Sequence, residues 1–414
     1  DQTLFESDLG VGDQYYYSLA GDALARGDGF VVPWHHVSIG LGLAEAGTAA
    51  PHAADHPPLT ALLAAPAGLL SDYPGERLLE QRLTMCLVGV AVVVVMALLG
   101  RLLAGPTTGL IAAAIAAIYP GFWINDGLVM AETPTTLMVA ALVCAVIHHR
   151  RRSSLLSAAV MGGLLALASL ARSESLLLWA LLIVPVVLAA DRLWKARLRH
   201  ITVATTLALL LLAPWVVPNL VRFDEPVVLS TNDGLTLIGA NSPQTYSGEA
   251  TGFWSLEYQQ ALAPAIPELA GADQSVVSRV WRDEALTFIT ENFEDQPRVM
   301  FARLGRLWSV YRPLQTIDFN KGEGREVWAS NLALVGMALI APFSLLGWHR
   351  LGRDGLERWP LAVLSVHVSI IAVLFYGIPR FRVPAEVGLV VLAAVAVAAL
   401  THSDQRNDVT PGEQ

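Results

Sequence analysis

The sequence predicts an all-α membrane protein that crosses the bilayer several times, and three observations carry this prediction. Of its 414 residues, 54% are hydrophobic and only 15% are charged, a balance that ordinary soluble domains do not show. Apolar runs recur along the chain, each near the roughly 17 to 25 residues that a helix needs to cross the hydrocarbon core. The formal net charge of −9 argues against nucleic-acid binding, which requires a clustered basic surface.

Nine of the apolar runs are long enough to be candidate spanning helices. They lie at residues 83–103, 107–123, 132–148, 155–171, 175–190, 201–218, 329–347, 360–376 and 385–401. An earlier apolar run, from Leu59 to Leu70, is too short to span. It follows His56-Pro57-Pro58, which favours extended backbone, and it predicts an interfacial or re-entrant helix.

Lysine and arginine residues predict the orientation of these helices. Alternate short loops and the tail hold twelve of them: Arg101, Arg150, Arg151, Arg152, Arg192, Lys195, Arg197, Arg199, Arg350, Arg353, Arg358 and Arg406. The opposite short loops hold only Arg172, Arg380 and Arg382. By the positive-inside rule the first set faces the cytoplasm. The abundance of arginine and alanine suggests a bacterium, so we expect the chain in the plasma (inner) membrane.

This orientation divides the chain into five parts. They are an external segment with juxtamembrane helices (1–82), six spans (83–218), an external loop domain (219–328), three spans (329–401) and a cytoplasmic tail (402–414). An external segment at the start of the chain requires export, so we expect a further helix upstream of Asp1.

The external loop domain is predicted to be small and mixed in structure. Short β-like runs at Pro226–Ser230 and Leu235–Ile238 flank Asn232-Asp233-Gly234, a hairpin-type turn signal. Helical patterns follow at 275–293 and 297–311. The second helix is expected on the membrane surface, with its arginines, Arg298, Arg303 and Arg306, near anionic head groups.

Ionisable residues gather at the external ends of the predicted spans. They are Asp126, Glu132, Arg172, Glu174, Arg380, Arg382 and Glu386, on the same side as Asp13 and His56. A transporter would favour sites near the midplane, whereas an enzyme that takes a lipid-borne substrate at the outer leaflet would favour this layer. Only His367 lies deep in a span, and it is interpreted as a hydrogen-bonded core residue.

Each candidate residue also has a structural interpretation. Asp13 precedes an amphipathic pattern, so it could simply cap the helix there. Glu132 could interact with a helix dipole, and Arg172 with Glu174 could form a surface pair. Arg380 and Arg382 could anchor lipid head groups. The acidic and histidine residues near the first loop match no standard metal pattern: His35, His36, His52, Asp55 and His56.

Several motifs, taken in order, resemble the GT-C glycosyltransferases. The branch concerned contains the dolichyl-phosphate-mannose protein mannosyltransferases and the bacterial lipid A aminoarabinose transferases. The similar segments are Asp13 with Tyr16, Ala20, Leu24 and Gly27-Asp28-Gly29-Phe30; His56-Pro57-Pro58-Leu59; Met130-Ala131-Glu132-Thr133-Pro134; Leu170-Ala171-Arg172-Ser173-Glu174; and Pro379-Arg380-Phe381-Arg382-Val383-Pro384. Their order and topology are the stronger part of the signal.

The resemblance implies a GT-C fold and a transferase with Asp13 as its catalytic carboxylate. It implies a polyprenyl-phosphate-sugar donor and an active site on the external or periplasmic face; the acceptor could be a lipid, a protein or a glycan. Substrate-binding candidates are Tyr16, His56, Glu132, Arg172, Arg380 and Arg382. His56 departs from the pattern, since many relatives carry lysine there, and Asp8 is a second candidate for the acid. Dependence on a divalent metal stays open, and no cofactor is certain.

The chemistry suits these residue types. One carboxylate can remove the proton of an acceptor hydroxyl, while arginine stabilises the leaving phosphate, so a single displacement would invert the anomeric centre. Two other classes of protein remain as alternatives. A transporter or flippase of lipid-linked sugars would carry polar residues through its spans, and a non-catalytic envelope assembly protein would not need Asp13.

Overall fold

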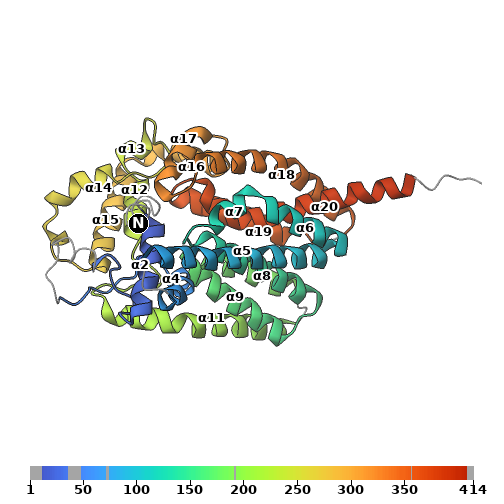
Figure 1. Cartoon of the computed structure of the whole chain (residues 1–414), viewed down its shortest axis with the longest axis horizontal. Helices are drawn as coiled ribbons and strands as arrows, with labels where there is room; N and C mark the ends of the chain where they lie inside the picture. Colours follow the sequence, from blue (N-terminus) through green and yellow to red (C-terminus); the bar gives the residue numbers. More distant parts are fainter. Residues whose placement is uncertain (1–11, 36–47, 71–73, 191–192, 356, 408–414) are drawn as a thin grey trace, which may run out of the picture.

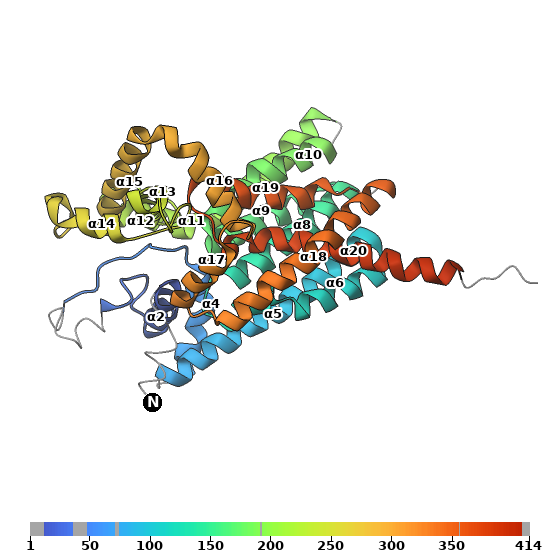
Figure 2. The ribbon, with the colours of Figure 1, turned by 90° about the horizontal axis from the view of Figure 1, so that it is seen from above.

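The fold is a helical bundle with a smaller helical domain at one end (Figures 1 and 2). The computed structural model describes residues 12–35, 48–70, 74–190, 193–355 and 357–407. Across these ranges nearly all regular structure is helical, and β-structure is limited to an isolated bridge between Val31 and His52. The prediction of an all-α membrane protein is confirmed.

Every one of the nine predicted spans is helical in the structure. The helices are α5 (Pro74–Ala104), α6 (Pro106–Ile118), α7 (Pro120–Asp126), α8 (Glu132–Arg151), α9 (Leu155–Ala171), the Ser173–Leu177 and Trp179–Ile183 turns with α10 (Val184–Ala190), α11 (Trp194–Arg222), α18 (Val327–Arg353), α19 (Trp359–Leu374) and α20 (Val383–Asn407). Five of the described helices are long and apolar enough to cross a membrane, or six if α6 and α7, bent by 56°, form one span. The others are shorter or carry more polar residues.

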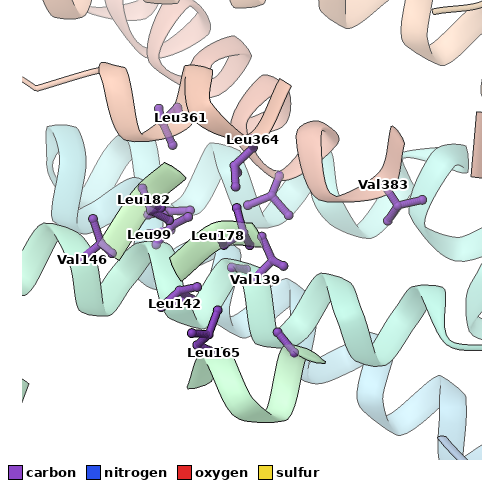
Figure 3. Close-up of a cluster of buried hydrophobic side chains, with 14 of the residues drawn as sticks. Leu99, Val139, Leu142, Val146, Leu165, Leu178, Leu182, Leu361, Leu364 and Val383 are labelled. Carbon is purple, nitrogen blue, oxygen red and sulfur yellow. The ribbon is translucent and has the colours of Figure 1, made fainter. Parts of the chain in front are cut away.

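Close helix packing is made possible by small residues. A Cβ atom on Gly162 of α9 would lie 2.0 Å from the Ala204 carbonyl oxygen of α11. A Cβ atom on Gly347 of α18 would lie 1.8 Å from the carbonyl oxygen of Leu392. In a bilayer, lipid tails are as apolar as leucine, so such close contact, not exclusion from water, drives helix association. Leucine and valine side chains from several helices fill the centre of the bundle (Figure 3).

Two short helical segments precede the bundle, as the sequence predicts. Helix α2 (Asp13–Arg26) ends at Gly27, whose φ of 85° is the left-handed conformation that glycine adopts at little cost. Helix α4 (Leu59–Ala64) continues into a 3₁₀ turn at Ala65–Leu69, so the predicted helix at 59–70 is confirmed. Helices α2 and α4 lie against each other, next to α5 and at one end of the bundle (Figure 2).

In the described part of residues 219–328, the loop domain that the sequence predicts to be external, all regular structure is helical, so the predicted β-runs at 226–230 and 235–238 are wrong. The helices are α12 (Asp233–Ala240), α13 (Pro243–Tyr246), α14 (Glu257–Leu262), α15 (Gln274–Glu291), α16 (Gln296–Leu307) and α17 (Pro313–Asn320). Asn232-Asp233-Gly234 begins α12 and is not a hairpin turn. Ile238 of α12 is buried against Trp281 of α15, and this tertiary contact overrides the local β-preference.

Helix α16 contradicts one further expectation. Arg303 and Arg306 are buried and do not face lipid head groups. Arg303 donates to the carbonyl oxygens of Ala240 and Val373, and Arg306 donates to those of Thr251 and Glu249. These hydrogen bonds tie the loop domain together internally and, through Val373, to α19. The helix ends at Leu307, earlier than predicted.

Candidate active site

A cavity of about 740 Å³ lies where the loop domain meets the bundle and α2. It is lined by five of the predicted site residues: Asp13, His56, Glu132, Arg172 and Arg380. These residues come from five separate segments of the chain, and the fold brings them together at one end of the bundle. Ionisable side chains from distant parts of the sequence therefore line one cavity.

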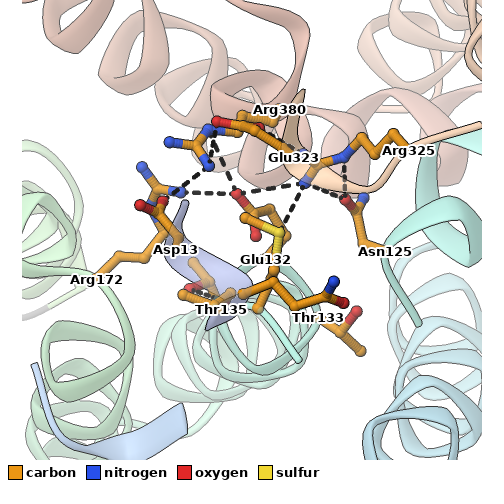
Figure 4. Close-up of polar contacts among 12 residues, drawn as sticks. Asp13, Asn125, Glu132, Thr133, Thr135, Arg172, Glu323, Arg325 and Arg380 are labelled. Carbon is orange, nitrogen blue, oxygen red and sulfur yellow. Dashed lines mark hydrogen bonds and ion pairs between the residues drawn. The ribbon is translucent and has the colours of Figure 1, made fainter. Parts of the chain in front are cut away.

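Asp13 does not cap α2. The N-cap position is Gly12, and no side chain caps the helix. Instead, Asp13 Oδ2 accepts a hydrogen bond from an Arg380 Nη atom at 2.8 Å (Figure 4). Asp13 Oδ1 lies 3.4 Å from His56 Nε2. The carboxylate therefore faces the cavity and its cationic groups, as a site residue would.

Burial and charge act in opposite directions on the pKa of Asp13. Burial raises it, but the charges of Arg380 and His56 outweigh burial and hold the pKa well below its usual range. Asp13 is therefore a carboxylate at neutral pH and can accept a proton. It contributes stability above its unfolded pKa, and this contribution is lost only as the pH falls through the lower pKa of the folded state.

Glu132 is the carboxylate that holds the arginines of the site. Its Oε1 lies 3.1 Å from an Arg172 Nη atom, 3.7 Å from an Arg325 Nη atom and 3.8 Å from Arg380 Nε. Within the described structure, its buried Oε2 and the buried Nε of Arg380 have no hydrogen-bond partner. Buried polar groups are seldom left unpaired, so these two atoms mark a place where a ligand or water would bind.

Two further charged residues, Glu323 and Arg325, belong to this group, although their sequence pattern did not predict it. Glu323 Oε1 lies 3.0 Å from the same Arg380 nitrogen that binds Asp13, and Glu323 Oε2 accepts from Arg325 at 2.6 Å. Burial raises the pKa of Glu323, against the lowering effect of Arg380 and Arg325. Both residues stand just before α18, so the rule that selected ionisable groups at helix ends could have found them.

His56 is fixed by aromatic rings and by the loop domain. The rings of Tyr16 and Tyr17 lie 4.9 and 5.0 Å from the imidazole, centroid to centroid. Tyr17 lines the cavity, but the predicted substrate contact Tyr16 is buried beneath His56 and is not among the lining residues. Tyr16 therefore supports the position of His56.

The segment before His56 is held by the first residue of α15. Gln274 Oε1 accepts from the Ala54 amide at 3.0 Å, and Gln274 Nε2 donates to Asp55 at 3.1 Å. The Thr231 amide also donates to the Ala54 carbonyl oxygen at 2.8 Å. The loop domain is thus attached directly to the segment that positions His56 beside Asp13.

Arg382 does not line this cavity, in contrast to its neighbour Arg380. Its Nε donates to Glu386 at 2.7 Å, and one Nη atom donates to the Leu307 carbonyl oxygen and to Ser309. These contacts join α20 to the end of α16. His367 lies 2.9 Å from the Glu174 carbonyl oxygen, in agreement with its interpretation as a core residue.

The other residues considered from the sequence are the candidate metal ligands and Asp8, the second candidate for the catalytic carboxylate. No group of three or more His, Cys, Asp or Glu side chains is placed to hold a metal ion among the residues that the structure describes. Asp8 and His36 lie outside those residues. The free cysteines, Cys86 and Cys144, lie on α5 and α8 and not in the cavity.

One wall of the cavity is apolar. Leu176, Leu177 and Ala180 line it from the irregular turns before α10, where a short π-helical segment interrupts the α-helical pattern. Ile371 of α19 and Phe375, the residue that follows this helix, line it as well. An apolar wall beside buried arginines suits a ligand with a charged head and a hydrocarbon chain.

Known proteins share both sequence and fold with this chain. Residues 55–217 match the family described as dolichyl-phosphate-mannose-protein mannosyltransferase. The crystal structure of the Archaeoglobus fulgidus oligosaccharyltransferase tethered with an acceptor peptide superposes with a TM-score of 0.53 and 15% identity, over 97% of this chain and 47% of that one. The chain has the GT-C fold. The segment that matches the family model includes His56, Glu132 and Arg172.

Two further solved structures resemble this chain. The apo form of the same oligosaccharyltransferase gives a TM-score of 0.50 and 14% identity, over 98% of this chain and 49% of that one. The crystal structure of ArnT from Cupriavidus metallidurans bound to undecaprenyl phosphate gives a TM-score of 0.45 and 12% identity, over 99% of this chain and 77% of that one. The chain spans about half the length of the oligosaccharyltransferase. No curated protein matches its sequence.

Proposed function

We propose that this GT-C protein transfers a sugar from a polyprenyl-phosphate donor to an acceptor hydroxyl at the external, periplasmic face of the membrane. One observation supports this most directly: the Asp13 carboxylate and the Arg172 and Arg380 guanidinium groups line one cavity at the end of an apolar bundle. The matching family is named for a dolichyl-phosphate-mannose donor. Such a donor combines a phosphate, a sugar and a hydrocarbon chain.

The phosphate and the prenyl chain of the donor would bind to different walls of the cavity. Its phosphate would bind Arg380 and Arg172, whose guanidinium groups match phosphate oxygens in geometry and charge. Its prenyl chain would follow the apolar side chains of Leu176, Leu177 and Phe375. The three arginines of the site are Arg172, Arg325 and Arg380, and four carboxylates face them: Asp13, Glu132, Glu174 and Glu323. The phosphate would therefore compete with carboxylates for Arg380.

Asp13 would act as the general base. It would take the proton of the acceptor hydroxyl while the hydroxyl oxygen attacks the anomeric carbon. The bond from that carbon to the phosphate oxygen would break, and the electron pair would leave with the phosphate, stabilised by arginine. A single displacement of this kind inverts the anomeric centre. His56 would hold the carboxylate in place, and Glu132 would position the arginines.

The test is transfer of radiolabel from dolichyl-phosphate-mannose and related polyprenyl-phosphate sugars in membranes that contain the protein. Transfer should be lost in Asp13→Asn and retained in the control variant Asp28→Asn. Asp28 lies just after α2 and forms an exposed ion pair with Arg26. No transfer from any donor, with the protein folded, would refute the proposed function. Flux of lipid-linked sugar without covalent product would favour a transporter instead.

A further inference from the structure

We propose that the loop-domain end of the cavity is the acceptor subsite and that its ligand is a neutral, hydroxyl-rich sugar. This inference rests on the proposed transferase function. The polar residues of this end are Ser230, Asn232, Asp233, Thr236 and Arg282. They line the same cavity as Asp13 and come from the loop domain, whereas the apolar wall comes from the bundle.

The net charge of this end excludes a strongly charged ligand. Arg282 Nε donates to Asp233 Oδ2 at 2.9 Å, and the side chains of this pair are 42% and 46% exposed. The two charges cancel, so an anionic acceptor would find no uncompensated cation there. Two arginines, Arg172 and Arg380, line the cavity at the proposed phosphate site, whereas Arg282 is the single arginine among the described residues that line the loop-domain end, and it is paired with Asp233.

Unused hydrogen-bonding groups at this end point to hydroxyl ligands. Within the described structure, the side-chain amide of Asn232, the Thr236 hydroxyl and the Nη atoms of Arg282 make no hydrogen bond to protein, whereas the backbone amide of Asn232 donates to Ser230. An amide and a hydroxyl each donate and accept, as a sugar hydroxyl does. A site that hydrogen-bonds a substrate hydroxyl discriminates strongly against ligands that lack one.

The neighbouring surface favours a sugar over a peptide. Pro226 and the 53% exposed Val228 line the cavity beside the polar groups and could contact the apolar face of a sugar ring. Extended peptides often bind by adding a strand to a sheet edge. The described part of the loop domain has no strand, so it offers no such edge.

The subsite is rigid and fixed relative to Asp13. Asp233 Oδ1 accepts from Ser278 at 2.8 Å, and the Gly234 amide donates to the same hydroxyl at 3.1 Å. Thr231, next to Asn232, is hydrogen-bonded to Ala54, two residues before His56. A ligand at this end would therefore be presented to the base at a constant position, as catalysis by positioning requires.

Binding without donor tests the subsite. Saturation-transfer NMR on the purified full chain in nanodiscs would use mannotriose, a neutral trisaccharide, and separately a serine- and threonine-rich hexapeptide. The variant Asn232→Leu/Thr236→Val removes the unused groups and keeps their approximate volume. Thr290→Val, at an exposed position of α15 outside the cavity, is the matched control. Thermal unfolding would verify that each variant is folded.

Wild type and Thr290→Val should bind the trisaccharide, and the double variant should bind it at least about tenfold more weakly, since each neutral hydrogen bond is worth roughly threefold to tenfold. Equal binding by the double variant would overturn the inference. So would peptide binding in place of trisaccharide binding, or no binding by wild type. A chain that binds the trisaccharide through these residues but transfers nothing would refute the proposed function alone.

Discussion

Arg380 binds two carboxylates through one nitrogen, and this arrangement predicts a pH dependence of donor binding. Its Nη atom lies 2.8 Å from Asp13 and 3.0 Å from Glu323. Burial already raises the pKa of Glu323, and a phosphate bound to Arg380 would raise it further by adding a negative charge. Donor binding should therefore take up a proton, and affinity should increase as the pH falls towards that pKa.

Dolichyl-phosphate-mannose is a suitable probe, because a phosphodiester keeps one charge across the range. Its dissociation constant should increase between pH 5.5 and 8 for wild type. Glu323→Gln should bind at least as tightly at pH 8 and lose the dependence on pH. The same slope in both proteins would show that Glu323 does not compete with the phosphate.

Arg382 illustrates how adjacent residues can differ in role. Its pair with Glu386 is buried on both sides, with side chains 3% and 2% exposed. Removing one partner of a buried pair leaves an uncompensated charge, at a cost of about 3–5 kcal/mol. Arg382→Met should therefore lower the thermal unfolding temperature in detergent, and Arg382→Met/Glu386→Leu should recover most of the loss. Loss of donor affinity at unchanged stability would instead give Arg382 a direct role in binding.

At the level of helices, the packing of α12 against α15 explains why the local prediction failed there. A Cβ atom on Gly234 would lie 1.9 Å from the Ser278 carbonyl oxygen. Gly234→Ala should thus destabilise the loop domain by about 1–3 kcal/mol, an overpacking cost. Gly127→Ala, where a Cβ atom meets nothing within 4 Å, is the control. Equal thermal stability of the two variants would contradict the close contact between these helices.

The sequence could locate the helices of the bundle, because the length and apolar character of a span are local properties. It also singled out Asp13, His56, Glu132, Arg172 and Arg380, which line the cavity, because ionisable residues next to long apolar runs are rare and easily recognised in a sequence. It could not reveal that Glu323 shares Arg380 with Asp13, since contacts between distant segments leave no local pattern. The same limitation made Asn232-Asp233-Gly234 look like a hairpin and made Arg303 look like a surface residue.

For the whole molecule, the central expectation is that the cavity opens on the external side. The loop domain and α2 lie together at one end of the bundle (Figure 2), so a single label can report the orientation of both. In a background of Cys86→Ala and Cys144→Ala, Thr290→Cys should react with a membrane-impermeant maleimide in intact cells. Ser153→Cys, between α8 and α9, should react only after the membrane is permeabilised. The opposite labelling pattern would place the cavity in the cytoplasm.

The most direct test of the account is sugar transfer by wild type and Asp13→Asn from dolichyl-phosphate-mannose and related polyprenyl-phosphate sugars. General-base catalysis contributes about 10²–10⁴-fold, so transfer should fall by at least about a hundredfold in Asp13→Asn and stay near the wild-type level in Asp28→Asn. Thermal unfolding and donor binding should show that the Asp13→Asn protein is folded. Equal transfer by wild type and Asp13→Asn would contradict the assignment of Asp13 as the base.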